Sequence, residues 1–528
     1  MSQPRTTRAR ARIGAVVASA VLALVLAACG GASSGSGASG APDPDATLRL
    51  TSAGVSTLDP TLTAGSTAVL SNTWPVYDRL LQISEDGQYL PMLATKWTFS
   101  EDGRTLRLDL RDDVTFTDGT PFTSATVKAN IERYQAAEVS AQATAIIDHV
   151  EIVDEHTADL VLTAPSRAVL AGISSAAPGI MISEQALDNP DLATHPVGSG
   201  AWEIESFRPM EQVVYKRRTD EGGIWDPESG KVAKVEIAVR TTDAAYSAIR
   251  SGQADVVLSN GDVNELQSAI DQGTLVQRPL VNSSTTVTMF LNQTVEPFDD
   301  VRVRRAVNLA INRRPLVEAL VPTTSPRVQP MASAINGFDE SLESAYDFDP
   351  EKAKELLAQA GHPDGVDAGT FYVGNYEPIP KAAQIVQSDL ADVGIDIDLE
   401  LYDVRQLSSG VYGKSDRPGA FMFLAYPGVE PGAALRFFLD NPLNMPGGVP
   451  QDVVDRIGAI DDSTATEDQR AERTRAVTGW AVDQAMFAPL YQGVPGWVMT
   501  DKVHGVEEGK AFLAPLGGQD LRHAWISK

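Results

Sequence analysis

The sequence predicts an α/β fold with more than one lobe, and three observations lead to this prediction. Apolar and polar residues alternate over 235–239, a short helix ends at Gly252, and a second strand follows at 254–258. The same pattern runs from 371–373 through a helix into the strictly alternating stretch 395–401. Strict alternation predicts a half-buried strand, and strands joined through helices indicate parallel sheets. The body of about 480 residues exceeds what one hydrophobic core usually organises, so we expect two or more lobes.

Local signals predict further elements and their ends. Leu106, Leu108 and Leu110 alternate with polar residues, which predicts another strand. Asp243 is the expected N-cap of the helix that ends at Gly252. A helix should begin at Asp349-Pro350 and end at Gly361, because aspartate caps, proline suits the first turn, and glycine ends a helix.

The N-terminus has the pattern of a secreted protein that is anchored by a lipid. Four arginines within the first twelve residues precede a 16-residue apolar run, 13–28, which ends in Leu26-Ala27-Ala28-Cys29. This run is shorter than the about 20 residues of a membrane-spanning helix and predicts a signal peptide over 1–28. Small residues before a lone cysteine resemble a bacterial lipobox, which implies cleavage before Cys29 and acylation of its thiol. An ordinary signal followed by a free structural cysteine is the alternative.

The composition limits the partners of the mature chain. Residues 29–45 are rich in glycine, serine and alanine and predict a flexible tether behind the lipid. Loss of residues 1–28 removes four arginines and no acids, so the formal charge changes from −27 to −31. Such a surface repels nucleic acid and anionic headgroups. We therefore expect no nucleic-acid partner, contact with the membrane through the lipid anchor only, and a location on the outer, extracellular or periplasmic, face of the cytoplasmic membrane.

Seven segments in order along the chain carry a family resemblance. They are Thr57-Leu58-Asp59-Pro60, 90–103 (LPMLATKWTFSEDG), 110–123 (LRDDVTFTDGTPFT), 196–202 (PVGSGAW), 250–255 (RSGQAD), 292–307 and 346–357. Together they resemble the family 5 extracellular solute-binding proteins, the peptide- and nickel-type receptors of ABC importers. The resemblance spans essentially the whole mature chain.

The resemblance implies an architecture and a partner. It implies a two-lobed periplasmic-binding-protein-like fold with a hinge and an extra inserted domain, of the type of the oligopeptide-binding proteins. Cargo would bind in the cleft between the lobes and favour closure, and the closed form, expected to be a monomer, would deliver a small molecule or peptide to an ABC permease and ATPase complex. The implied ranges are 46–75 with 195–280 and 488–528 for lobe I, 76–194 for the insertion, and 281–487 for lobe II.

The resemblance also points to residues of the cleft. The loop around Ala53, Gly54 and Val55 is the stretch whose backbone groups meet an extended ligand in the oligopeptide-binding relatives. The segment 421–431 matches a stretch of those relatives that contains a stacking tryptophan, an aspartate and a proline. The candidates there and near the second hinge crossing are Tyr426, Gly428, Glu430, Tyr491 and Trp497.

Tyr426 stands where the relatives' tryptophan stacks on ligand, although a core aromatic is the alternative. The aspartate that grips a peptide's α-ammonium has no clear counterpart, and only Glu430 offers a carboxylate. The sequence therefore does not decide whether the cargo is a peptide.

Two other motifs have structural alternatives. The arginines at 302, 304, 305, 313 and 314 could bind an anion, but a capped, amphipathic helix favours a solvated or salt-bridged face. The stretch 196–200 could cradle a phosphate but lacks the lysine of a P-loop, and it reads better as a chain crossing between lobes.

The sequence gives little sign of catalysis. The six histidines show no metal-ligand spacing, and no Gly-x-Ser-x-Gly motif stands near a credible strand, turn and helix. We therefore predict no enzyme activity, no cofactor and no metal. Three hypotheses follow: an importer receptor for a peptide or peptide-like solute, the same receptor with a sugar, opine or metal chelate, or a surface enzyme or other lipoprotein outside transport.

Overall fold

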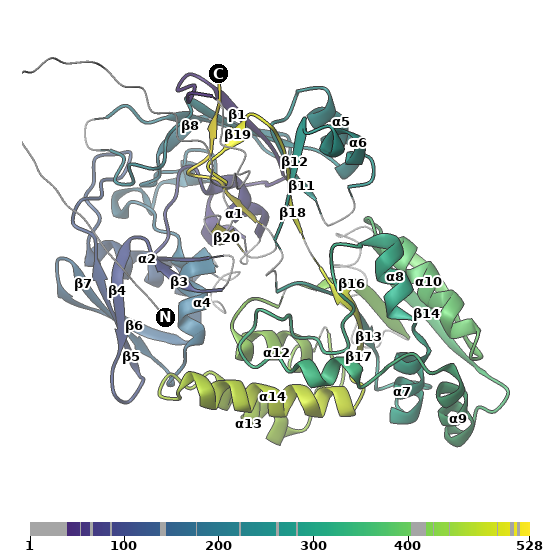
Figure 1. The fold of residues 1–528 in the computed structure, drawn as a ribbon. Helices are drawn as coiled ribbons and strands as arrows, with labels where there is room; N and C mark the ends of the chain where they lie inside the picture. The colour runs from purple at the N-terminus through teal and green to yellow at the C-terminus, as the bar shows by residue number, and fades with distance from the viewer. Residues whose placement is uncertain are drawn as a thin grey trace, which may run out of the picture. The chain divides into compact units, whose positions relative to one another are not determined.

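Three β-sheets of four or more strands organise the described part of the chain in the computed structural model (Figure 1). The structure describes residues 40–528 except 53, 64–66, 85–86, 138–143, 176, 221–222, 260–262, 281–283, 403–418, 426, 443, 494, 507–511 and 515–517. The predicted signal peptide, Cys29 and the tether up to residue 39 lie outside the described residues.

The first sheet has seven strands in the order β12-β18-β11-β1-β10-β9-β8, and we call it with its helices lobe I. Its strands are β1 (Thr47–Ser52), β8 (Trp202–Arg208), β9 (Gln212–Arg217), β10 (Lys234–Val239), β11 (Val256–Ser259), β12 (Leu275–Pro279) and β18 (Gly496–Thr500). β1 pairs in parallel with both β10 and β11. One face packs with α1 (Thr67–Thr73) in one core, and the other face packs with α5 (Thr242–Arg250) and α6 (Gln267–Asp271) in a second core.

The second sheet has five strands in the order β15-β14-β16-β13-β17, and we call it with its helices lobe II. Its strands are β13 (Thr286–Leu291), β14 (Val366–Gly374), β15 (Ile395–Tyr402), β16 (Ala420–Ala425) and β17 (Phe487–Gln492). Its helices are α7 (Val301–Ala310), α8 (Arg313–Leu320), α9 (Pro350–Ala360), α10 (Ile379–Ala391), α12 (Pro431–Leu439), α13 (Gln451–Ile460) and α14 (Glu467–Asp483).

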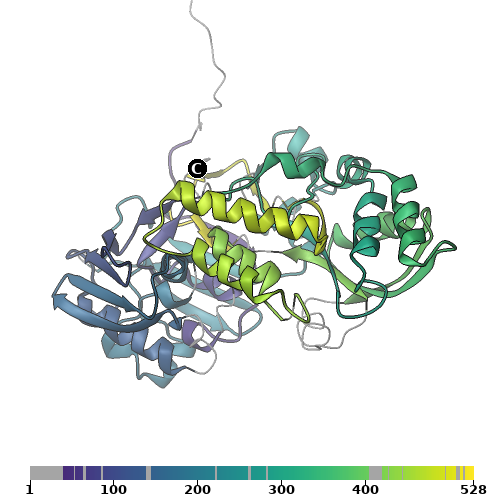
Figure 2. The same ribbon diagram turned by 90° about the horizontal axis from the view of Figure 1, so that it is seen from below.

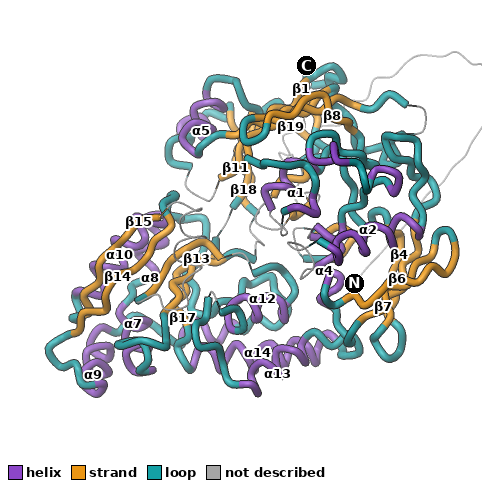
Figure 3. The backbone as a smooth tube through the Cα atoms, turned by 180° about the vertical axis from the view of Figure 1, so that it is seen from behind, coloured by secondary structure: helices purple, strands orange, loops and turns teal. Residues whose placement is uncertain are grey.

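Helices cover both faces of this five-stranded sheet. Met289 and Met422 pack against α7 to α10, whereas Phe290 and Phe421 pack against α12 to α14. The alternation follows from the two-residue period of a strand. Figure 3 shows the resulting layers from behind, with α8 and α10 on one side of β13 and α12 to α14 on the other.

The third sheet belongs to residues 76–194, which we call the inserted subdomain. Its strands are β4 (Ala94–Phe99), β5 (Thr105–Leu110), β6 (Ile147–Asp154) and β7 (Thr157–Leu162), in the order β4-β5-β7-β6. α2 (Ser124–Ala136) and α4 (Ala168–Ser175) share its core, and the hairpin of β2 (Leu81–Ile83) and β3 (Tyr89–Pro91) lies beside it. Two-stranded ribbons near the C-terminus are β19 (Val503–His504) with β22 (Trp525–Ile526) and β20 (Phe512–Ala514) with β21 (Gly518–Asp520).

The structure confirms the predicted α/β elements and corrects one cap. β5, β10 with α5 and β11, and β14 with α10 and β15 stand where the sequence predicts them. Asp349 caps α9 by accepting a hydrogen bond from the Lys352 N–H at 2.9 Å, and Gly361 ends that helix with a φ of 102°. The N-cap of α5 is Thr241 and not Asp243, which lies in the first turn where a carboxylate favours the helix dipole.

One predicted domain boundary is wrong. The strands within the ranges predicted for lobe I up to residue 280 all lie in the seven-stranded sheet, and β4 to β7 of the inserted subdomain form a four-stranded sheet of their own. β17, however, pairs with β13 in lobe II, so the second crossing follows Gln492 instead of preceding Ala488. The apolar run 487–491 has no alternation that would assign it to one sheet or the other. The remaining ranges stay a prediction.

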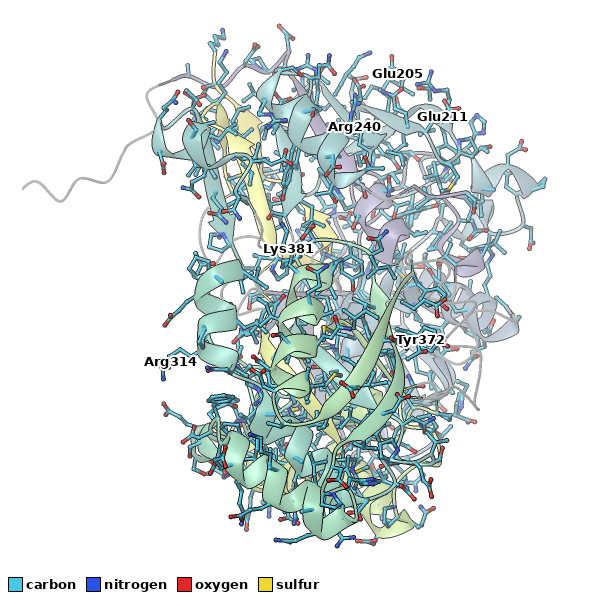
Figure 4. All side chains as sticks on the ribbon, turned by 90° about the vertical axis from the view of Figure 1, so that its right-hand side faces the viewer. Glu205, Glu211, Arg240, Arg314, Tyr372 and Lys381 are labelled. Carbon is cyan, nitrogen blue, oxygen red and sulfur yellow. The ribbon has the colours of Figure 1, made fainter. Side chains whose placement is uncertain are left out.

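The arginine cluster is divided between buried main-chain contacts and the salt-bridged, solvated face that the sequence favours. Arg304 donates to the carbonyls of Phe298 and Gln484, and Arg313 donates to those of Asn308 and Pro489. Burial lowers the pKa of Arg313 to about 10, so the group stays charged at neutral pH. Arg302 pairs with Asp300 and Arg305 pairs with Asp483 on the half-buried side of α7, and Arg314 projects into solvent (Figure 4).

The glycines of the segment 196–202 serve a close backbone approach. A Cβ at Gly198 would lie 1.9 Å from the Val76 carbonyl oxygen, and a Cβ at Gly200 would lie 2.4 Å from that of Pro75. The Gly200 N–H donates to the Val76 carbonyl at 2.9 Å. The segment therefore passes directly against residues 75–76, where only glycine fits.

Candidate functional site

The chain passes from one lobe to the other between β12 and β13, and returns between β17 and β18. The carboxyl ends of the parallel strands in both lobes lie at these two crossings. β12 ends beside the start of β18, with Pro279 opposite Gly496, and β13 starts beside the end of β17, with Thr286 opposite Gln492. The crossings are bonded to each other, because the Gly493 N–H donates to the Thr285 carbonyl at 2.9 Å. Ligands of open α/β sheets bind outside the carboxyl ends of the strands, so this geometry places the candidate site between the lobes.

A cavity of about 360 Å³ lies between lobe II and the inserted subdomain, and we call it the Glu430 cavity. It is lined from the inserted subdomain by Gly87, Gln88, Tyr89 and Arg167, and from lobe II and its crossing by Ser284, Ala334, Ile335, Asn336, Val429, Glu430, Pro431, Glu467 and Arg470. Its size falls within the range of small-molecule sites, about 300–1,000 Å³. Figure 2, seen from below, shows α13 and α14 beside the inserted subdomain.

Glu430 is the N-cap of α12 and is almost fully buried, with 5 % of its surface exposed. Its Oε2 accepts a hydrogen bond from Arg470 Nη2 at 2.5 Å, and its Oε1 accepts one from the Tyr89 hydroxyl at 2.8 Å. Burial and the Glu430 carboxylate raise the pKa of Tyr89 well above its usual value, so the phenol stays neutral and donates. The carboxylate is therefore held by one group from lobe II and one from the inserted subdomain.

The polar contacts continue from Arg470 back to the inserted subdomain. Arg470 Nη1 lies 3.1 Å from Glu467 Oε2, and Glu467 Oε1 lies 3.3 Å from Arg167 Nη2. The main chain adds two contacts: the Arg167 N–H donates to the Asp461 carbonyl at 2.7 Å, and the Ser463 hydroxyl donates to the Gly103 carbonyl at 2.9 Å. Two carboxylates and two guanidinium groups thus surround one cavity. Such a wall is suited to a solute that carries charges of both signs.

The predicted loop after β1 is held by the β8–β9 turn. The Met210 N–H donates to the Val55 carbonyl at 2.9 Å, and a Cβ at Gly54 would lie 2.9 Å from the Met210 side chain. Met210 has a φ of 61°, which is rare outside glycine, and half of its surface is exposed. Ala53 lies outside the described residues.

The other predicted site residues are divided between the cavity and the cores. Glu430 lines the cavity, and Gly428 is exposed two residues before it. Tyr491 is buried in the core of lobe II, and Trp497 is fully buried in lobe I, where Arg278 lies over its ring at 5.9 Å. Neither aromatic ring has surface to offer a cargo in this structure, and a cargo contact from either stays a prediction. Tyr426 lies outside the described residues.

Sequence reasoning missed Tyr89, Arg167, Glu467 and Arg470. One signal for Arg470 was available, because it is spaced with Thr474, Val477 and Ala481 on the buried stripe of α14. A charged residue on a buried stripe needs a partner, which points to a nearby carboxylate. Arg167 and Tyr89 carry no comparable signal.

A larger cavity of about 620 Å³ lies at the amino edge of the lobe I sheet, beside Thr47, Asp255 and Lys528, away from the crossings. Among the described residues, no three histidine, cysteine, aspartate or glutamate side chains come together as metal ligands. Within the same part of the chain, no helix has the length and apolar composition needed to cross a bilayer.

Comparison with known proteins first defines the class. The peptide-binding protein DppA from Helicobacter pylori, solved with the peptide STSA, superposes with a TM-score of 0.76 at 21% identity, covering 92% of this chain and 98% of that one. NikA from Brucella suis, solved with Fe(III)-EDTA, superposes with a TM-score of 0.77 at 21% identity, covering 92% and 100%. The fold is thus that of the two-lobed periplasmic binding proteins, as predicted.

Sequence comparison then defines the family. The model of the bacterial extracellular solute-binding proteins, family 5, matches residues 88–425, and the chain belongs to this family. The glutathione-binding protein GsiB of Salmonella typhi is 29% identical over 383 residues, which cover 70% of this chain and 72% of that protein. The protein is therefore a periplasmic or extracellular solute-binding protein of an ABC importer, works with its permease and ATPase, and is not an enzyme.

Proposed function

We propose that the protein captures a small peptide or peptide-like solute between its lobes and delivers it to the permease. The observation that carries this proposal is the ring of Glu430, Arg470, Glu467 and Arg167 around one cavity, since a peptide carries an ammonium and a carboxylate group. The similarity to the glutathione-binding protein GsiB supports the same class of cargo.

In this proposal Glu430 accepts a cationic group of the cargo, because each carboxylate oxygen keeps a second acceptor position beside its present bond. Tyr426 stacks on the cargo, and Gly428 and the loop 53–55 lie along it. Closure adds contacts from the second wall, so affinity depends on both lobes.

The test is to identify the solute that copurifies with the protein by mass spectrometry, followed by calorimetry with glutathione and the peptide STSA. A bound peptide or glutathione conjugate is the expected result. A copurifying sugar, together with no heat of binding from either peptide, would contradict the proposal.

A metal chelate is the second candidate cargo. It is favoured by the missing aspartate in the stretch 421–431 and by the arginines of the cavity, which suit the carboxylates of a chelator. Binding of Fe(III)-EDTA or a nickel–histidine complex, with no response to peptides, would distinguish it.

We propose further that the mature protein begins at Cys29 and is held by a lipid on the outer face of the cytoplasmic membrane, as a monomer. The support is the sequence Leu26-Ala27-Ala28-Cys29 after an apolar run of signal-peptide length. Cys29→Ser should abolish acylation and release the protein from the membrane fraction, because one residue supplies the anchor. Retention of this variant with the membrane would contradict the anchor, whereas the cargo test does not depend on it.

A further inference from the structure

Arg167 stands on the wall of the Glu430 cavity that the inserted subdomain contributes. It lies directly before α4, and its main-chain N–H is bonded to the Asp461 carbonyl at the end of α13. The Leu170 N–H in turn donates to the Arg167 carbonyl at 2.9 Å. The hydrogen bond between the Arg167 N–H and the Asp461 carbonyl therefore links the inserted subdomain to lobe II and also fixes the main-chain position of Arg167.

The two guanidinium groups of the cavity differ in how fully they are used. Arg470 is 2 % exposed, and each of its nitrogens has an acceptor: the Ile460 carbonyl for Nε, Glu467 for Nη1 and Glu430 for Nη2. Arg167 reaches Glu467 only at 3.3 Å through Nη2. Its Nε is buried and has no hydrogen-bond partner in the described part of the chain.

A buried N–H donor without an acceptor is disfavoured, so the Nε of Arg167 calls for a partner that the described residues do not supply. Guanidinium binds the planar carboxylate group in a two-point geometry, through Nε and one Nη. The Glu467 contact is long enough to be exchanged for such a group without leaving Glu467 unpaired, since Arg470 Nη1 and Asn336 Nδ2 also donate to it.

We propose that Arg167 is a cargo-binding residue and takes a carboxylate of the solute, so that the inserted subdomain forms a third wall of the site. This rests on the function proposed above, a cargo with charges of both signs, and assigns one of those charges to a named residue. Because the main chain of Arg167 is placed by the contact with Asp461, binding of the carboxylate also favours the docked position of the subdomain.

The test compares the peptide STSA with its C-terminal amide, which lacks the carboxylate and keeps the rest of the ligand. Calorimetry would use the wild type, Arg167→Gln, Arg167→Lys and the control Arg107→Gln. Arg107 belongs to the same subdomain and also pairs with one carboxylate, that of Asp159 at 2.7 Å, but does not line the cavity. Thermal melts without ligand would show that all four proteins are folded.

We expect the wild type and Arg107→Gln to bind the acid about tenfold or more tightly than the amide, as one charge-assisted hydrogen-bonded pair predicts. Arg167→Gln should bind acid and amide alike, at the level of the wild type with the amide. Arg167→Lys should keep part of the preference, because it retains the charge without the two-point geometry.

Each contrary result has its own meaning. If the wild type binds the acid and Arg167→Gln keeps the full preference, the role of Arg167 is refuted while the peptide cargo stands. If Arg107→Gln loses the preference to the same degree, the effect is one of general charge, and the proposal is refuted as well. If the wild type binds neither STSA nor glutathione, the peptide-like cargo fails first, and the assignment to Arg167 fails with it.

Discussion

Glu430→Gln tests whether the ion pair with Arg470 stabilises lobe II. Glu430 and Arg470 are 5 % and 2 % exposed, so the substitution leaves a buried guanidinium facing a neutral amide. Removing one partner of a buried pair costs about 3–5 kcal/mol. Arg470 keeps Glu467 and the Ile460 carbonyl, and the new amide oxygen can still accept from Tyr89, so we expect a smaller cost of about 2–3 kcal/mol, close to that of one lost hydrogen bond between charged groups.

The assay is thermal unfolding of the ligand-free protein followed by calorimetry. At about 2.1 cal/mol/K per residue, cooperative unfolding of Gly40–Lys528 has an entropy of roughly 1 kcal/mol/K, so the Tm should fall by about 2–3 °C. Glu351→Gln is the control, because Glu351 is 82% exposed and its pair with Lys354 should be worth little. A Tm for Glu430→Gln that matches the control would refute the reasoning and show that Glu467 alone satisfies Arg470.

Three other substitutions test separate parts of the molecule. Tyr426→Ala should weaken cargo binding in calorimetry by about 1–3 kcal/mol through lost stacking, with little change in Tm, and a collapse of the Tm would instead identify a core aromatic. Gly198→Ala should abolish soluble expression or lower the Tm strongly, because its Cβ would overlap the neighbouring main chain, whereas Gly458→Ala in α13, with open space around it, should be neutral or stabilising. Burial alone would raise the pKa of Asp59, but its arginine partner at 2.7 Å and the Thr61 groups lower it below its usual value. Asp59 therefore stabilises the fold above about pH 4 and loses this effect as the pH falls through its lowered pKa, so melts at pH 6 should show Asp59→Asn less stable by about 3 kcal/mol, and the difference should shrink as the pH is lowered below about 4. The absence of any difference between the two proteins at pH 6 would contradict the charged pair.

The parts of the fold that the sequence predicted are those with local causes. The β14–α10–β15 unit follows from strict alternation, and the ends of α9 follow from Asp349 and Gly361. β17 could not be assigned to its lobe, because a strand buried on both faces has no alternation and its partner β13 is about 200 residues away along the chain. The boundary at 488 failed for this reason.

The candidate site was predicted only where a contiguous motif marks it. Glu430 was found because the stretch 421–431 resembles a known ligand-binding segment. Tyr89, Arg167 and Arg470 come from a hairpin, a helix start and a helix interior that are distant in sequence. Arginine is common on exposed helix faces, as Arg475 shows in the same helix as Arg470, so its type alone does not mark it as part of a site.

The contacts between the inserted subdomain and lobe II also decide how closure is controlled. The side-chain pair of Arg167 and Glu467 is 26% and 58% exposed, and such pairs contribute about 0–1 kcal/mol each. The strong pair of Glu430 and Arg470 lies wholly within lobe II and is kept whether or not the subdomain is docked. A shift from 1:99 to 99:1 in favour of a closed state requires about 5.5 kcal/mol. The partly buried bond from Tyr89 to Glu430, at about 1.5–3 kcal/mol, and the two main-chain bonds, at about 1 kcal/mol each, add to the pair of Arg167 and Glu467, so the contacts between the two walls together come close to this figure. In the proposed function, a solute that reaches both Glu430 and Arg167 therefore needs to add only a small further preference for the closed form, whereas one that reaches Glu430 alone adds less.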